Sequence, residues 1–456
     1  MRAVNKTSLL QAVFLCFLII SASSTSLSQG QDSSKYFVLD NGLKVFLLER
    51  HTLPLVNIVA AVNLGSKDET EDTNGLAHLL EHAILYRGTE FRSSSEIGQD
   101  IRCHGAFFNA HTGEDVSLFE ISLPAEYTDF GLENQKEILF NLKLSQETLD
   151  KEKEVILEEI SQIQDDPEKH ATSLVFQNLF KGHPYQRPVY GTREAIKAAT
   201  VEKLEAFSKR YFVPANCALA AVGDLSLKDM EEKVKNTFGI IKSEAFSPSK
   251  FDKVTPLEKS VDLVEEMDVK EGYLVIGLNA PDYNHPDQYA VDILTEILGR
   301  GINPLLNSVL RGRRDLIQTV SMSYNAQLYG GIILIYLGGD PKNLKAAKRE
   351  ATSFLKQLRN ENFSKEDFPG QEQMFVFDFL ESAKNQIKFN AEQSQEKGLT
   401  LASMLARYLL LHEDSKSENY LENIRRIDSS DLRKAATKYF SKGEYVTVSI
   451  VPQKKS

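Results

Sequence analysis

Cysteine and histidine are scarce in this sequence, which has 3 and 9 of them among 456 residues. Three cysteines are too few for a disulfide framework, so the chain is not one of the small disulfide-stabilised folds of secreted proteins. Cys16 lies near the N-terminus, and we expect Cys103 and Cys217 to be free or buried thiols. Stability must come from hydrophobic cores instead, and the chain is long enough for about two or three domains.

Positive charge is also in deficit, because the formal net charge is -11 and the isoelectric point is near 5.5. This balance argues against a general binder of nucleic acids or of anionic membranes. Hydrophobic residues make up 42% of the chain and charged residues 26%, which is typical of a globular protein. The composition favours an acidic enzyme.

The first 31 residues contain no Asp or Glu. Arg2 and Lys6 precede an apolar run at 9–22, and small residues follow it. This pattern predicts a secretory signal peptide over residues 1–28, whereas a mitochondrial presequence would be amphipathic and richer in Arg. The run is shorter than the roughly 20 apolar residues that span a membrane. We therefore expect export to the periplasm or the cell exterior, with no stable membrane span after cleavage.

Two of the few histidines, His78 and His82, lie four residues apart in the apolar segment 75–89. On a helix this spacing places both imidazoles on one face, where they can share a metal ion, and zinc commonly takes nitrogen ligands. Glu81 lies beside them, and a carboxylate there can take a proton from water that the metal activates. The alternative is a buried helix whose polar side chains are satisfied by neighbours.

A catalytic zinc site uses three protein ligands, so the third must come from another element. Residues 144–164 are expected to form a charged amphipathic helix. Its apolar face is predicted to hold Leu149, Val155, Ile156, Ile160 and Ile163. At 100° per residue, Glu152 and Glu159 fall within this face or at its edge, whereas Glu158 points roughly opposite. An inward carboxylate needs a partner, and the choice is between a metal and water at the rim of the core.

These motifs resemble the pitrilysin/insulinase family of inverted zinc metallopeptidases, which combines His-x-x-Glu-His with a later Glu-x6-Glu helix at the spacing seen here. The chain is similar to the short, two-domain members, such as the mitochondrial processing peptidase beta subunit and bacterial processing-peptidase-like proteins. The resemblance implies that His78, His82 and Glu159 bind one Zn²⁺ per chain. It also implies that Glu81 is the catalytic general base and that Glu152 supports the ligands.

The family also has an Asn-Ala pair on a strand that lines the substrate channel, and Asn109 and Ala110 match it. Many members carry Arg-x6-Tyr in an inert repeat, where both side chains reach the substrate carbonyl. Arg311 lies in the matching context, but Gln318 stands where the family has Tyr. The resemblance therefore implies that Asn109, Ala110 and Arg311 contact substrate, and that the carbonyl-polarising pair is incomplete.

An internal duplication is visible when one half of the sequence is laid over the other. Ala77, Ile84 and Gly88 then match Ala290, Ile297 and Gly301, while Tyr211 and Phe212 match Tyr439 and Phe440. His78, Glu81 and His82 fall on Val291, Leu294 and Thr295, so the second half cannot repeat the metal site.

Strands are expected at 36–48, around an Asp40-Asn41-Gly42 turn, and at 54–64, 107–123 and 219–222. We predict an α+β fold of two homologous α/β-sandwich domains, each an antiparallel-rich sheet covered by helices. The zinc-binding catalytic domain would be 29–248 and its homologue without metal 249–456, with the boundary in 242–256.

The sequence thus predicts an exported zinc metalloendopeptidase that hydrolyses peptides or unfolded polypeptide segments. The alternative is a non-catalytic or partner-dependent scaffold, or a processing-complex subunit, that retains a metal site; Gln318 favours it mildly. A single pair of domains leaves the metal cleft open on one side, so we expect a second homologous chain. A homodimer would present Gln318 twice, which favours a heterodimer.

Overall fold

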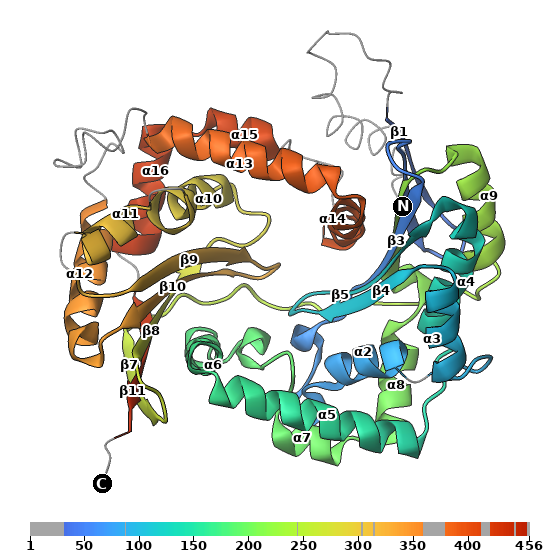
Figure 1. The fold of residues 1–456 in the computed structure, drawn as a ribbon, viewed down its shortest axis with the longest axis horizontal. Helices are drawn as coiled ribbons and strands as arrows, with labels where there is room; N and C mark the ends of the chain where they lie inside the picture. Colours follow the sequence, from blue (N-terminus) through green and yellow to red (C-terminus); the bar gives the residue numbers. More distant parts are fainter. Residues whose placement is uncertain are drawn as a thin grey trace. The chain divides into compact units, whose positions relative to one another are not determined.

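The computed structural model describes residues 32–86, 88–243, 245–301, 304–312, 315–358, 379–411, 420–441 and 444–453. The expected signal peptide, 1–28, lies outside the described residues. The described chain forms two compact units, each of which combines one β-sheet with helices (Figure 1). The fold is mixed α+β, as the sequence predicts.

The two units exchange segments of the sequence. The chain passes from the first unit to the second between Lys250 and Phe251, inside the expected boundary. However, the first unit also contains 393–419 and the second contains 161–188. Each unit is therefore completed by a helix from the other half of the sequence, and neither 29–248 nor 249–456 matches one compact unit.

The first unit has a six-stranded sheet in the order β1-β2-β6-β3-β5-β4. Its strands are β1 (Ser33–Val38), β2 (Lys44–Glu49), β3 (Leu55–Val62), β4 (Phe107–Thr112), β5 (Ser117–Pro124) and β6 (Cys217–Gly223). β2 and β6 pair in parallel and the other neighbours are antiparallel. The expected hairpin is confirmed, since Val38 pairs with Lys44 across the turn, where Gly42 has a φ of +93°. The expected strand 107–123 is two strands, β4 and β5, joined by a short turn.

Helices cover both faces of this sheet. They are α2 (Leu76–Tyr86), α3 (Ser94–Cys103), α4 (Thr128–Phe140), α5 (Gln146–Asp165), α7 (Arg193–Ala198), α8 (Val201–Tyr211), α9 (Leu227–Phe238) and α14 (Gly398–Leu411). Val45, Leu47 and Ile58 belong to the core shared with α2, α4 and α8, whereas Phe46 and Leu48 face α14. Successive strand residues are buried on opposite faces, which explains why β6 and the four central residues of β2 are apolar rather than alternating.

The second unit repeats the same sheet pattern, in the order β7-β11-β8-β10-β9. Its strands are β7 (Val261–Met267), β8 (Gly272–Ala280), β9 (Thr319–Ala326), β10 (Gly331–Gly339) and β11 (Tyr445–Pro452). β7 and β11 are parallel, as β2 and β6 are. Strand β11 follows a helix and a buried Phe, as β6 does, so the internal duplication predicted from the sequence is confirmed.

Helices also cover both faces of the second sheet. They are α6 (Pro167–Leu179), α10 (Gln288–Thr295), α11 (Leu305–Asn307), α12 (Leu344–Gln357), α13 (Phe379–Glu396), α15 (Tyr420–Arg426) and α16 (Ser429–Ala435). Val175 of α6, drawn in green in Figure 1, packs with Val275 and Val448 on one face, while α10, α12 and α16 share the core of the other. The two units thus have the same layered architecture.

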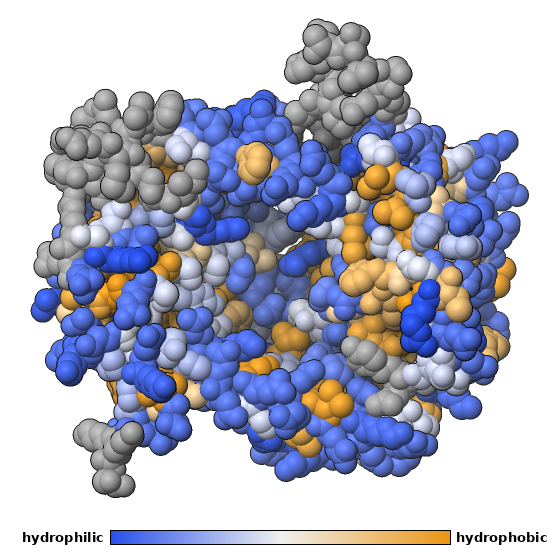
Figure 2. Space-filling view, viewed as in Figure 1, coloured by the Kyte–Doolittle hydropathy of each residue, from blue (hydrophilic) through white to orange (hydrophobic). Residues whose placement is uncertain are grey.

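Hydrophilic residues cover most of the face drawn in Figure 2, with hydrophobic residues in smaller patches between them. Among the residues that the structure describes, no helix has the length and apolar character needed to cross a membrane. Cys103 is exposed and Cys217 is buried, and both are free thiols, as expected.

Candidate metal centre

Helix α2 carries His78, Glu81 and His82, and its first turn is held by a buried carboxylate. Glu69 accepts hydrogen bonds from the backbone N–H groups of Gly75 (2.9 Å) and Ala77 (2.8 Å), which satisfies donors at the start of the helix. Gly75 has a φ of +96°, and a Cβ there would lie 2.8 Å from the Cα of Gly191. Sequence reasoning missed Glu69, because it lies seven residues before Leu76, outside the positions where a helix start is recognised.

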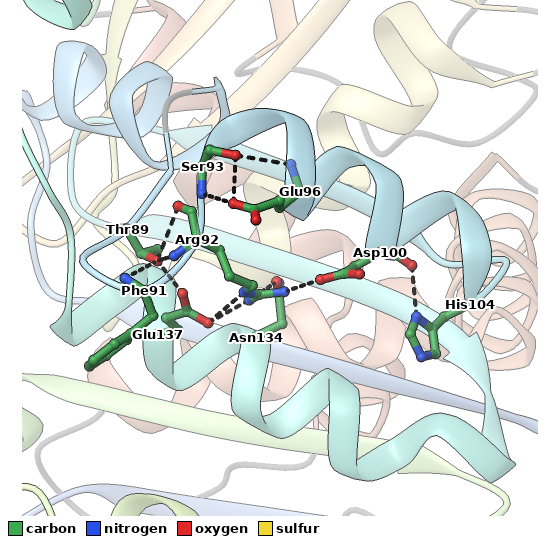
Figure 3. A network of polar contacts seen from close by, with 9 residues as sticks. All are labelled: Thr89, Phe91, Arg92, Ser93, Glu96, Asp100, His104, Asn134 and Glu137. Carbon is green, nitrogen blue, oxygen red and sulfur yellow. Dashed lines mark hydrogen bonds and ion pairs between the residues drawn. The ribbon is translucent and has the colours of Figure 1, made fainter.

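The segment after α2 is fixed by a second set of polar contacts (Figure 3). Arg92 donates from Nε to Glu137 at 2.8 Å and from its other nitrogens to Asn134 at 3.1 Å and Asp100 at 2.9 Å. The Thr89 hydroxyl also donates to Glu137. The planar guanidinium of Arg92 has several hydrogen-bond donors, so it can connect the segment after α2 to both α3 and α4. Polar contacts therefore fix the chain on both sides of α2.

Helix α5 presents its two expected glutamates to α2. Glu152 is only 1% exposed, Glu159 is partly buried and Glu158 is exposed, as the helix phase predicts. The expectation for Val155 is wrong, since it is 42% exposed. At 100° per residue it lies roughly 110° from the centre of the stripe formed by Leu149 and the three isoleucines, beyond the reach of the core.

The three predicted ligand side chains converge on one point. One nitrogen of His78, one nitrogen of His82 and one oxygen of Glu159 all lie within 4.8 Å of one another. The Glu159 oxygen is 3.9 Å from Nε2 of His78 and 3.7 Å from Nε2 of His82. Bonds of about 2.0–2.2 Å to a tetrahedral zinc ion would separate such ligand atoms by roughly 3.3 Å. The donor set and its spacing therefore fit zinc after a small inward adjustment.

Burial and nearby charges shift the pKa values of the two imidazoles in opposite directions. Burial, together with the charge of His82, lowers the pKa of His78 to about 4, so its imidazole is neutral and has a lone pair for a metal. Its Nδ1 is buried and has no hydrogen-bond partner among the described residues. For His82 burial acts downward, but the hydrogen bond with Glu152 and the charges of Glu159 and Glu81 outweigh it, and the pKa is raised.

Glu152 holds the second imidazole in place. Its carboxylate lies 3.0 Å from Nδ1 of His82, which leaves Nε2 of that ring directed at the cluster. A metal-binding histidine usually donates its other N–H to a carboxylate or carbonyl in this way, which fixes the ring and its tautomer. The contact therefore has the geometry expected for a residue that orients a ligand.

Glu81 is buried beside the cluster and belongs to no ion pair within it. Burial raises the pKa of its carboxyl, although a hydrogen bond with Thr112 and the charges of His82 and His111 act in the opposite direction. A carboxyl group whose pKa is shifted toward neutrality is suited to proton transfer. Thr112 was not identified from the sequence; it follows Ala110 by two on β4, so its side chain lies on the same face of the strand.

The three expected substrate-contact residues lie in different settings. Asn109 and Ala110 are adjacent on β4, the edge strand of the described first sheet, and therefore point to opposite faces. Asn109 contacts His111, whereas Ala110 belongs to the core on the α2 side. Arg311 and Gln318 belong to the second unit, and both are exposed there.

Comparison with known proteins identifies the family of the chain. A model of the insulinase family, peptidase family M16, matches residues 44–193, and a model of the peptidase M16 inactive domain matches 198–373. The chain belongs to the insulinase family. The first match contains His78, Glu81, His82 and Glu159, and the second match contains no His-x-x-Glu-His.

Several similar proteins bear the name of zinc protease. Zinc protease PqqE of Helicobacter pylori is 25% identical over 422 residues, which are 91% of this chain and 92% of that protein. An uncharacterized zinc protease of Rickettsia bellii is 24% identical over 413 residues, 88% of this chain and 94% of that protein. The crystal structure of a Helicobacter pylori protease has a TM-score of 0.84 and 23% identity, covering 92% of this chain and all of that one. At this identity the crystal structure shows a shared fold.

Proposed function

We propose that this insulinase-family chain is a zinc-dependent endopeptidase that cleaves peptides or unfolded polypeptide segments. The convergence of His78, His82 and Glu159 on one point, with the buried Glu81 beside them, carries the proposal. Polar groups of this kind are expensive to bury together unless something binds them. The names of the relatives, which are zinc proteases, agree with it.

The three converging side chains would hold one zinc ion per chain. When bound, zinc would act as a Lewis acid toward a peptide carbonyl and would lower the pKa of water in its coordination sphere to about 7. Glu81 would take a proton from the attacking water and return it to the leaving amine, as its raised pKa permits. Glu152 would keep His82 in the tautomer that leaves Nε2 for the metal.

Two further parts of the proposal rest on the sequence. The N-terminal pattern at 1–28 favours export to the periplasm or cell exterior. Gln318, in place of the family's Tyr, favours a complex with a second, homologous chain that supplies a complete Arg-x6-Tyr pair. Size determination of the purified chain with and without co-expressed homologues tests the complex, and N-terminal sequencing of the secreted protein tests the export.

A second candidate function is a partner-dependent or non-catalytic subunit that keeps its metal site. The observation that favours it is again Gln318, because an amide stands there in place of the tyrosine whose hydroxyl, in the family, reaches the scissile carbonyl. Under this alternative the chain binds zinc and peptides but does not cleave them when alone.

The deciding experiment combines metal analysis with a peptidase assay on the wild type and on Glu81→Gln. We expect wild type to bind one zinc ion and to cleave unstructured peptides, and the variant to keep zinc but lose activity by about 10²–10⁴-fold. Loss of zinc from the variant would contradict the role assigned to Glu81. Zinc binding without cleavage by wild type, alone and with homologous partners, would favour the non-catalytic subunit.

A further inference from the structure

A carboxylate is buried on the face of the first sheet that α14 covers. Glu120 of β5 is 7% exposed and lies opposite Asn109 of β4, so the two side chains share this face. Apolar residues lie on the same face, among them Val59, which pairs with Glu120 across β3 and β5, and Leu401 and Ala406 of α14. A carboxylate in such surroundings requires compensating partners.

Among the residues that the structure describes, Glu120 has few such partners. The hydroxyl of Ser403, on α14, is its hydrogen-bond donor, and the same hydroxyl is also 2.9 Å from the carbonyl oxygen of Leu399. A hydroxyl has one hydrogen, so these two acceptors share it. The other oxygen of Glu120 lies 3.5 Å from Nε2 of His111, whose side chain is 59% exposed. A carboxylate can accept about four hydrogen bonds, so Glu120 retains acceptor capacity on the side toward His111.

The open side of Glu120 faces the edge of the sheet. β4 is the last strand of the sheet within the described residues, and an extended peptide can add to such an edge through main-chain hydrogen bonds. Side chains of an added strand alternate between the two faces. Those beside Ala110 and Thr112 face the side of α2, whereas their neighbours in the peptide face Asn109, His111 and Glu120.

We propose that Glu120 and His111 form a subsite that binds a Lys or Arg side chain of the peptide, which rests on the proposed peptidase function. Two strand spacings of about 4.8 Å separate an added strand from β5, roughly 10 Å in all. A side chain of the peptide bridges this gap only if it is long and if Glu120 extends toward it. Lys and Arg have long side chains that end in positively charged hydrogen-bond donors. The exposed side chain of His111 moves aside, and the cationic end of the Lys or Arg side chain passes beside Asn109. It then places a positive charge next to the carboxylate of Glu120.

The subsite lies on the sheet face opposite α2, and its one link to the metal centre is the charge of His111, which acts on Glu81. The subsite selects substrates by a peptide residue whose side chain faces away from α2, next in sequence to residues whose side chains face α2. A hydrogen bond between a cation and a largely buried carboxylate predicts a preference of roughly ten-fold for Lys or Arg over Gln at that position.

Peptide binding to the zinc-loaded, full-length Glu81→Gln variant tests the subsite without cleavage. Fluorescence anisotropy is measured with extended peptides that differ only by Lys or Gln at successive positions. We expect Lys peptides to bind about ten-fold more tightly at alternate positions. In the same background Glu120→Gln should reduce this ratio to near one, whereas Glu126→Gln, an exposed glutamate just after β5, should preserve it.

A second variant protects the test against misfolding of Glu120→Gln. His111→Lys changes an exposed side chain, places a cation over Glu120 and should also abolish the preference. Equal binding of Lys and Gln peptides at every position, no binding of any peptide, or a preference that survives both variants would overturn the subsite. If the preference for Lys is found but wild type cleaves no peptide, the peptidase proposal is wrong and the subsite stands. If wild type cleaves peptides but shows no preference, only the subsite is wrong.

Discussion

Replacing Glu152 by Gln should weaken zinc binding by about 10- to 100-fold, even though Glu152 is not one of the three expected ligands. Its carboxylate is 1% exposed and 3.0 Å from Nδ1 of His82. Gln keeps the shape but removes the charge, so the imidazole becomes a weaker donor to the metal. The expected loss equals about 1.4–2.7 kcal/mol, which matches the contribution of a hydrogen bond to a charged group.

The pH dependence of this loss has a definite sign. The pKa of His82 is raised, since the Glu152 hydrogen bond and nearby negative charges outweigh burial, so protons compete with zinc for its ring. Glu152→Gln lowers that pKa and relieves the competition at low pH. The variant should therefore lose more affinity near pH 8 than near pH 6.

Zinc affinity is measured by competition with a chromogenic chelator, with Glu158→Gln as the matched control because Glu158 is exposed on the same helix. The rise of the melting temperature on zinc addition provides an independent measure. Affinity of Glu152→Gln within about two-fold of wild type at both pH values would refute the reasoning. A control variant that loses as much zinc would mean that helix charge, not the contact with His82, is responsible.

Four further results are expected. Glu159→Gln should lose zinc while Glu158→Gln keeps it in the same titration, and the reverse would overturn the helix register. Burial raises the pKa of Asp292 to about 6, so the contribution of its carboxyl group to stability is full below about pH 4 and is lost as the pH rises through 6. Asp292→Asn should therefore melt at a higher temperature than wild type at pH 8 but not at pH 4. Equal melting temperatures at pH 8 would contradict this. Gly75→Ala should lower both the melting temperature and zinc affinity, because alanine is strained at a φ of +96° and its Cβ meets backbone; unchanged values of both would disprove it. The fragment 29–248 lacks α14, so it should aggregate or bind hydrophobic dyes, and a soluble, cooperatively melting fragment would exclude a need for that helix.

The cluster of His78, His82 and Glu159 could be predicted from the sequence because it depends on local periodicity. The spacing of His78 and His82 on α2, and the phase that separates Glu152 and Glu159 from Glu158 on α5, follow from 3.6 residues per turn. The same reasoning was wrong for Val155, since periodicity gives a direction around the helix but not the width of the surface that covers it.

Contacts between distant segments could not be predicted in this way. Glu69 holds the start of α2, Thr112 contacts Glu81, and Ser403 reaches Glu120 across 283 positions of sequence. None of these contacts leaves a periodic trace, because each depends on which elements the fold places side by side.

The sequence by itself determined the residues of the candidate metal centre, the duplication and the two sheets of this protein, since short-range geometry and hydrophobic patterning specify them. Only the tertiary structure decided that α14 and α6 are exchanged between the two units, and that Glu120 is a buried carboxylate at the edge of a sheet. The physical reason is that a helix with one apolar face can cover any sheet of matching shape, and its choice of sheet is fixed by the packing of the whole chain.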